Sequence, residues 1–167
     1  MKKPEHQLEV HRPNILVADM ERSLRIYRDI IGFKVNFLLD ALDVAYEMFG
    51  LPHGSKLRMA FISEGKGAFG SLALTAAEGV ELPRRQAPFN TCIIIELVEG
   101  RLQGVLEQLR AEGCEIGTAY ELEQPTRTDV TVTDPDGHRL VLFEIHSKPK
   151  RVIGDGAKAA DNAPTGS

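Results

Sequence analysis

Few residues of this chain could bind a metal ion or attack a substrate, and their spacing matches no catalytic motif. No two of the five histidines have the H-x-x-x-H spacing that places two rings on one face of a helix. The two cysteines, Cys92 and Cys114, fit no zinc or redox spacing. No serine or cysteine lies in a nucleophile motif, and no phosphate-binding loop follows a strand-like segment. Any chemistry must therefore come from a pocket that secondary structure elements build.

Composition excludes several classes of protein. The chain has 167 residues, enough for about one domain, and 43% of them are hydrophobic, so a core can form without disulfides. Its 20 basic and 24 acidic residues give a net charge of −4, which offers no electrostatic basis for binding nucleic acid. The longest aliphatic run, residues 92–95, is too short to cross a membrane. We expect a cytoplasmic protein, because no secretory signal is visible and the thiols are expected to be free.

The first half of the chain predicts a strand, a helix and three further strands. Residues 14–18 are mostly aliphatic and predict a strand. Asp19 is suited to cap the following helix, because its carboxylate can accept from free backbone N–H groups. Gly32 is expected to end that helix. The helix shows apolar residues at intervals of four, three and four, at Met20, Leu24, Tyr27 and Ile31. The three strands are expected at residues 33–38, 57–63 and 71–75.

A short segment between two of these strands has two interpretations. In residues 41–50, Leu42, Tyr46 and Phe49 have helical spacing. The segment is either a packed turn or a cover over a pocket. We favour packing, because aromatic side chains at helical spacing usually belong to a core.

The same order of elements recurs in the second half. Residues 91–98 predict a strand, and Gly113 is expected to end the next helix. That helix has an apolar stripe at Leu102, Val105, Leu106 and Leu109. Strands are then expected at residues 114–122, 129–133 and 139–145, the last two joined by a type I turn at 134–137. The repeat predicts two β-α-β-β-β modules at 8–79 and 89–147, a linker at 80–88 and a disordered tail at 148–167.

Two motifs within this repeat resemble the vicinal oxygen chelate superfamily, which includes glyoxalase I, bleomycin-resistance proteins and extradiol dioxygenases. The first motif is Asp19-x-x-x-Ser23-x-x-x-Tyr27-x-x-x-x-Gly32. The second is Asp134-Pro-Asp-Gly-His-Arg-Leu-Val-Leu-Phe-Glu144. The resemblance covers residues 8–147 and implies an α+β fold, in which two βαβββ modules form a half-open barrel around one pocket. A fold alone does not imply one reaction.

Many members of that superfamily bind a divalent metal through His and Glu side chains, and the resemblance implies where those ligands would lie. The first position is Arg12, whereas the neighbouring His11 should point to the opposite face of the strand. Two others are Ala73 and Val141, and the remaining one lies near Cys92, a conceivable soft ligand. None of these is the usual ligand, so we expect no metal and no other cofactor.

Strand alternation then predicts a mostly apolar pocket with a few polar anchors. The expected ligand-binding residues are Arg12, Asn14, Leu16, Ala73, Arg139, Val141 and Phe143. Arg12 either pairs with an anionic group of the ligand or forms a surface salt bridge. Asn14 either orients a ligand oxygen or bonds a neighbouring backbone group. No catalytic residue can be named from these patterns.

Two classes of function remain. One is a binding protein, similar to the bleomycin-resistance branch, for a small, largely apolar or aromatic molecule that is anionic or oxygen-rich. The other is a lyase, isomerase or dioxygenase, metal-free or with a displaced metal, that acts on a small carbonyl or aromatic compound. The missing metal ligands favour the first. In both classes the partner is a small molecule, and the open strand edges favour a homodimer. The net charge and the absence of a long apolar run lead us to expect no nucleic acid and no membrane as partners.

Overall fold

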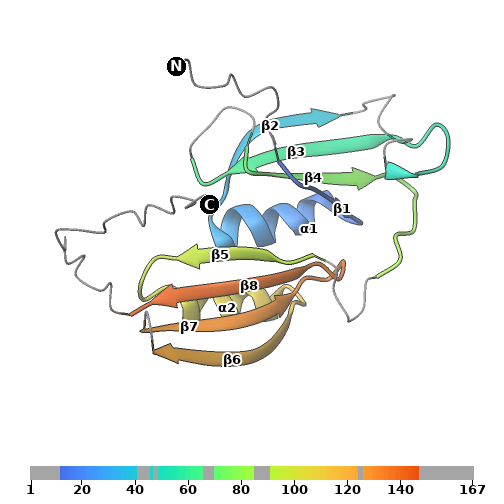
Figure 1. The fold of residues 1–167 in the computed structure, drawn as a ribbon. Coiled ribbons are helices and arrows are strands. Elements are labelled where there is room, and N and C mark those ends of the chain that lie inside the picture. The colour runs from blue at the N-terminus through green and yellow to red at the C-terminus, as the bar shows by residue number, and fades with distance from the viewer. Residues whose placement is uncertain are drawn as a thin grey trace, which may run out of the picture.

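A computed structural model describes residues 12–40, 46, 49–65, 70–84, 91–123 and 126–146, and it contains two four-stranded sheets (Figure 1). The first sheet comprises β1 (Asn14–Val17), β2 (Lys34–Asp40), β3 (Leu57–Ser63) and β4 (Leu72–Ala77). The second comprises β5 (Ile93–Leu97), β6 (Glu115–Glu123), β7 (Thr126–Thr133) and β8 (Arg139–Ile145). The expected tail and most of residues 41–50 lie outside the described residues.

Three helical segments connect the strands. The segments are α1 (Met20–Leu24), η1 (Arg25–Ile31) and α2 (Leu102–Ala111). Asp19 caps α1 as expected, since its Oδ1 accepts from the Arg22 backbone N–H at 3.0 Å. The sequence predicted one continuous α-helix up to Gly32, but its second half, η1, is wound as a π-helix. Gly32 ends it with φ +109°, a conformation that glycine adopts without strain.

The two sheets repeat one topology. β1 pairs in parallel with β4, and β5 pairs in parallel with β8, while the other strand pairs are antiparallel. The strand orders β1-β4-β3-β2 and β5-β8-β7-β6 are therefore equivalent. This confirms the expected βαβββ modules and the α+β class. The sheets remain separate and do not close into a barrel.

A common core joins the two modules. The helix that begins with α1 lies between the two sheets, α2 lies behind β7 and β8, and one face of each sheet contributes to the core (Figure 1). Ile15 and Val17 of β1 belong to this core, as do Leu140 and Leu142 of β8. Because side chains alternate along a strand, Asn14 and Leu16 of β1 lie on the opposite face of the first sheet, away from the helices. The residues that alternate with Leu140 and Leu142 on β8 lie likewise on the outer face of the second sheet. Those outer faces are where a ligand could be bound.

Polar contacts fix how the modules meet. The hydroxyl of Tyr27, a fully buried residue of η1, donates to Oδ2 of Asp134 at 2.9 Å. Arg22 forms an ion pair with Asp136 at 2.9 Å. Nε2 of His138 lies 2.6 Å from the carbonyl oxygen of Leu16. Both motifs that carried the resemblance therefore meet at the module junction.

No helix in the described ranges is long and apolar enough to cross a membrane.

Candidate functional site

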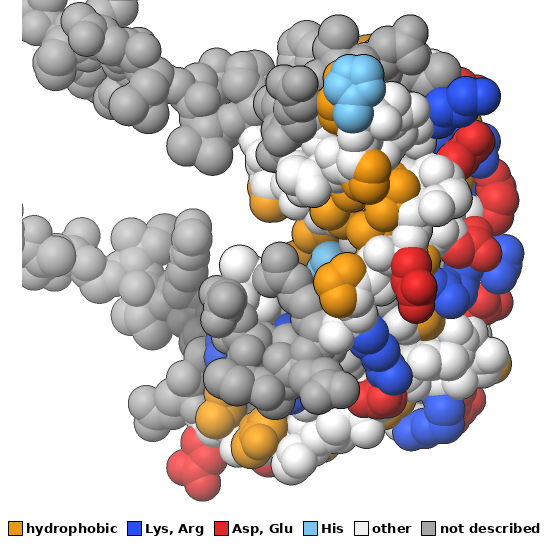
Figure 2. All heavy atoms as spheres, turned by 90° about the vertical axis from the view of Figure 1, so that its right-hand side faces the viewer, with side chains coloured by type: hydrophobic (Ala, Val, Ile, Leu, Met, Phe, Trp, Pro, Cys, Tyr) orange, Lys and Arg blue, Asp and Glu red, His pale blue; other side chains and the backbone are white. Residues whose placement is uncertain are grey.

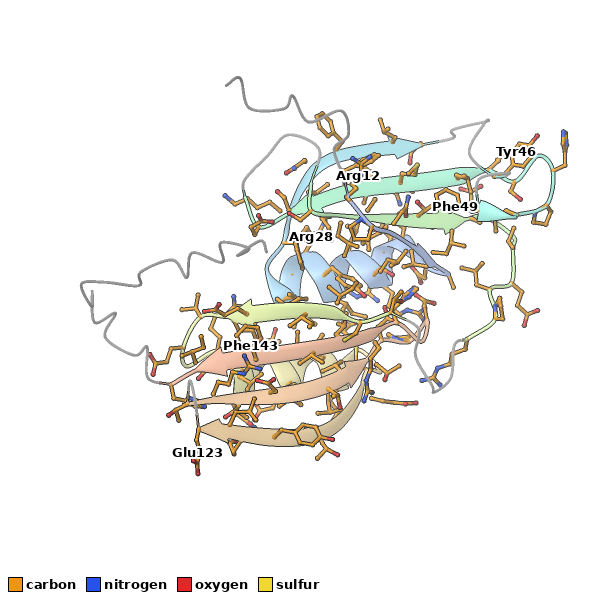
Figure 3. The ribbon with its side chains drawn as sticks, in the orientation of Figure 1. Arg12, Arg28, Tyr46, Phe49, Glu123 and Phe143 are labelled. Carbon is orange, nitrogen blue, oxygen red and sulfur yellow. The ribbon has the colours of Figure 1, made fainter. Side chains whose placement is uncertain are left out.

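Arg12 lies on an aromatic ring of the first sheet. Its guanidinium carbon is 4.0 Å from the ring centroid of Phe61, a residue of β3. Figure 3 shows Arg12 at the upper sheet. Phe61 forms a small cluster with Met59 and with Ala73 of β4. The three residues lie on one face because Phe61 is paired with Ala73 across adjacent strands. Phe37 of β2 extends this apolar face, with its ring edge-on to Phe61 at 6.5 Å.

The guanidinium of Arg12 has no acidic partner within the part of the chain that the structure describes. Other arginines differ: Arg22, Arg58 and Arg84 form ion pairs with Asp136, Glu21 and Glu115. The surface salt bridge considered for Arg12 is therefore not observed among the described residues. A half-buried guanidinium over an aromatic ring keeps its five N–H donors available to an anion.

Asn14 and Leu16 follow Arg12 on the same face of β1. The side-chain oxygen of Asn14 accepts a hydrogen bond from the Thr75 hydroxyl at 2.9 Å. Asn14 thus bonds a side chain on β4, whereas sequence analysis had considered a ligand oxygen or a neighbouring backbone group. Within the described ranges its amide nitrogen has no acceptor and is not a buried unsatisfied atom, so it can donate to a ligand.

The other expected site residues lie on the second sheet. Arg139, Val141 and Phe143 alternate along β8 on the face turned away from α2. Figure 3 shows Phe143 on the lower sheet and Arg12 on the upper sheet, well apart. The seven residues therefore form two groups within one chain and do not line one cavity.

Other side chains of the second sheet already contact Phe143 and Arg139. The Arg127 guanidinium lies 5.1 Å from the Phe143 ring centroid and pairs with Asp129 at 2.8 Å. Arg139 donates to the Thr133 hydroxyl at 2.9 Å. Sequence analysis missed Phe61 and Arg127, because strand alternation cannot select them until the register of β3 and β7 is known.

A pocket of about 690 Å³ opens between the two modules. Its walls come from β1, the start of β5, the segment at Leu82 and Pro83, and the turn that carries His138. Phe49 also lines it and packs near Leu57, so this residue both packs against the core and borders the pocket. Figure 2 shows hydrophobic side chains gathered in the hollow between the upper and lower halves. We call this cavity the junction pocket.

Comparison with known families identifies this arrangement. Residues 9–142 match the Glyoxalase/Bleomycin resistance protein/Dioxygenase superfamily. The chain belongs to this superfamily. No curated protein matches it.

Solved structures of the superfamily share the fold at low sequence identity. A glyoxalase family protein from Bacillus cereus is 14% identical with a TM-score of 0.67, covering 84% of this chain and 96% of its own. Glyoxalase I of Leishmania major is 23% identical with a TM-score of 0.58, covering 83% of this chain and 87% of its own. The fosfomycin resistance protein of Listeria monocytogenes is 14% identical with a TM-score of 0.52, covering 82% and 93%. These similarities establish the fold and leave the ligand open.

The residues that sequence analysis aligned with the superfamily's metal positions are poor metal ligands. Ala73, paired with Asn14, and Val141, paired with Ile94, carry no side-chain donor atom. Arg12 is cationic and lies over Phe61. The described residues contain no group of three or more His, Cys, Asp or Glu that could hold a metal ion. His11 lies outside them.

Proposed function

We propose that this superfamily member binds a small anionic molecule with an apolar or aromatic body, and that binding needs no metal. The guanidinium of Arg12, which lies over Phe61 and has no acidic partner among the described residues, carries this proposal. A carboxylate or phosphate can accept two parallel N–H bonds from arginine, a contact that is roughly twice as strong as a neutral hydrogen bond.

The surroundings of Arg12 select the rest of the ligand. Met59, Phe61 and Ala73 form a buried apolar cluster beneath the guanidinium. Phe37 beside them is 46% exposed, so an aromatic or aliphatic body can pack against the exposed part of its ring. An anion without an apolar part would leave that part of Phe37 in contact with water and gain less from binding.

A homodimer would bring the two groups of site residues together. One chain holds Arg12 and Phe61 on its first sheet, whereas Val141 and Phe143 lie on its second sheet. If the first sheet of one copy faces the second sheet of another, both groups line one enclosed site. The second sheet also exposes apolar surface that such contact would cover, including Ile94 at 68% and Tyr120 at 53% exposed.

Titration with 2-naphthoate tests the anion site. The variant Arg12→Ala should bind about tenfold more weakly or worse, because a hydrogen bond to a charged group contributes roughly 1.5–3 kcal/mol. Arg12→Lys should recover part of the affinity through charge alone. Arg84→Ala is the matched control, since Arg84 is exposed and paired with Glu115. Unchanged affinity in Arg12→Ala, or tighter binding of a cationic naphthalene, would refute the proposal.

Subunit mixing tests the homodimer. Light scattering should report a dimer in the micromolar range. Arg12→Ala and Phe143→Ala should each bind 2-naphthoate weakly. In a mixed dimer, one of the two sites combines the intact first sheet of the Phe143→Ala chain with the intact second sheet of the Arg12→Ala chain, so one site should be regained. A monomer, or mixed samples that bind no better than the separate variants, would contradict a shared site.

A further inference from the structure

We propose that the junction pocket is a second binding site, which takes a neutral apolar alcohol or phenol rather than an anion. Its volume of about 690 Å³ lies within the range of small-molecule sites. Apolar side chains from both modules line it, among them Leu16, Phe49 and Ile93. The ligand would therefore bury a hydrocarbon body between the modules.

The charges around the junction pocket cancel. Asp136 lines it, but its carboxylate is mostly buried and paired with Arg22 at 2.9 Å. Arg12 is not among the lining residues. A ligand carboxylate would meet the oxygens of Asp136 without a cation of its own, so its desolvation would not be compensated. The pocket therefore favours neutral molecules.

His138 supplies a fixed hydrogen-bond acceptor. A carbonyl oxygen can only accept, so the contact of Nε2 with Leu16 places the proton on Nε2. In the neutral ring Nδ1 is then an acceptor, and in the described part of the chain it has no partner and is not a buried unsatisfied atom. The backbone N–H of His138 donates to Asp134 at 2.7 Å, which holds the residue in place.

A hydroxyl group is complementary to Nδ1 of His138 and the side-chain amide nitrogen of Asn14, both on residues that line the pocket. Its O–H could donate to Nδ1 of His138, and its oxygen could accept from the amide nitrogen of Asn14, whose own oxygen is occupied by Thr75. An ether of the same shape keeps only the acceptor. A hydroxyl should therefore bind about two- to tenfold more tightly than the matching methyl ether, the range expected for one neutral hydrogen bond.

A native cysteine reports occupancy of the junction pocket. Cys92 is exposed and lines it. Cys114 is buried, and burial, with Asp134 and Glu112 nearby, raises the pKa of its thiol to about 12, so it should react far more slowly. Alkylation of the full-length protein by iodoacetamide therefore follows Cys92, and a bound ligand should slow that reaction.

The experiment compares three naphthalenes at about pH 8. Saturating 2-naphthol should slow alkylation of Cys92 at least fivefold, 2-methoxynaphthalene should bind two- to tenfold more weakly, and 2-naphthoate should not protect. Arg12→Ala should leave protection by 2-naphthol unchanged, which separates this site from the anion site. No protection up to the solubility limit of 2-naphthol, or equal protection by 2-naphthoate, would overturn the proposal.

Filling the pocket provides an independent test by calorimetry. Thr91→Trp places a large ring at the wall of the pocket and should abolish binding of 2-naphthol, since Thr91 lines it outside any strand. Val98→Trp is the matched control, because Val98 is 73% exposed and is not among the lining residues. Wild-type binding by Thr91→Trp, or equal loss in both variants, would show that naphthol binds elsewhere.

Discussion

Removing one hydroxyl group at the module junction should destabilise the whole protein. Tyr27 is 0% and Asp134 1% exposed, and the Tyr27 hydroxyl donates to Oδ2 of Asp134 at 2.9 Å. Oδ1 of the same carboxylate accepts from the backbone N–H groups of Asp136 and His138 at 3.0 and 2.7 Å. The variant Tyr27→Phe leaves the ring in place and deprives only Oδ2 of its partner.

The expected cost is about 1.5–3 kcal/mol at neutral pH, the range for a hydrogen bond to a charged group. A loss of that size should lower Tm by about 5–10 °C in a domain of this length. The cost arises because Oδ2 cannot reach water in its place. A change of only a few tenths of a kcal/mol would mean that water replaces the hydroxyl.

The cost should also depend on pH. Burial raises the pKa of Asp134, opposed by His138, the backbone hydrogen bond and the Tyr27 hydroxyl. An acid with a raised folded-state pKa stabilises the fold most when protonated, and this contribution is lost as pH rises through that pKa. Tyr27→Phe raises the pKa of Asp134 further. The difference from wild type should therefore be small near pH 3 and grow towards pH 7.

Urea unfolding of wild type and variant at about pH 3 and pH 7 measures this effect. Tyr120→Phe is the matched control, because Tyr120 is 53% exposed and should change stability by less than about 0.5 kcal/mol. A double-mutant cycle with Asp134→Asn should give a coupling of about 0.5–3 kcal/mol. Equal stability of Tyr27→Phe and wild type at pH 7, or a cost that is the same at both pH values, would refute the reasoning.

Three further perturbations test other parts of the structure. Glu144 accepts from the backbone N–H of Leu102 at 2.8 Å. Burial opposes ionisation of this carboxyl, but the backbone donors at the start of α2 lower its pKa. In urea unfolding, Glu144→Gln should therefore cost about 1 kcal/mol of stability at pH 7 and less as the pH falls below about 4. Gly70 has φ +79°, and an added Cβ would lie 2.6 Å from the Ile62 carbonyl oxygen, so Gly70→Ala should cost about 2 kcal/mol or more. Gly79→Ala, with φ +71° and open space, should cost only about 1 kcal/mol, and equal costs would argue against the contact. Treatment with a chelator should leave Tm and 2-naphthoate affinity unchanged, and a loss restored by zinc or manganese would contradict metal-free binding.

Much of the fold could be predicted because its signals are local. Asp19 and Gly32 mark helix ends through their own backbone and capping preferences, and alternation of apolar residues placed Ile15 and Val17 opposite Asn14 and Leu16. The structure confirms these assignments. The π-helical winding of η1 was not predicted, because periodicity of three and four does not distinguish it from a continuing α-helix.

The candidate site was less accessible to sequence analysis. Arg12 was selected as a candidate anchor, yet its ring partner, Phe61, depends on the pairing of β3 with β4. No local pattern encodes that register. The junction pocket was not anticipated either, since its walls come from segments more than 100 residues apart in the chain, such as Leu16 and His138.

The sequence by itself determined the repeated strand-helix-strand order and the superfamily, because each depends on residue types at short spacing. The tertiary structure decided which of these residues meet. It separated the expected site into Arg12 with its neighbours on one sheet and Val141 and Phe143 on the other. It also joined Tyr27 to Asp134 across the module junction. Such contacts depend on strand register and on the docking of modules, and both are set by the packing of the whole core.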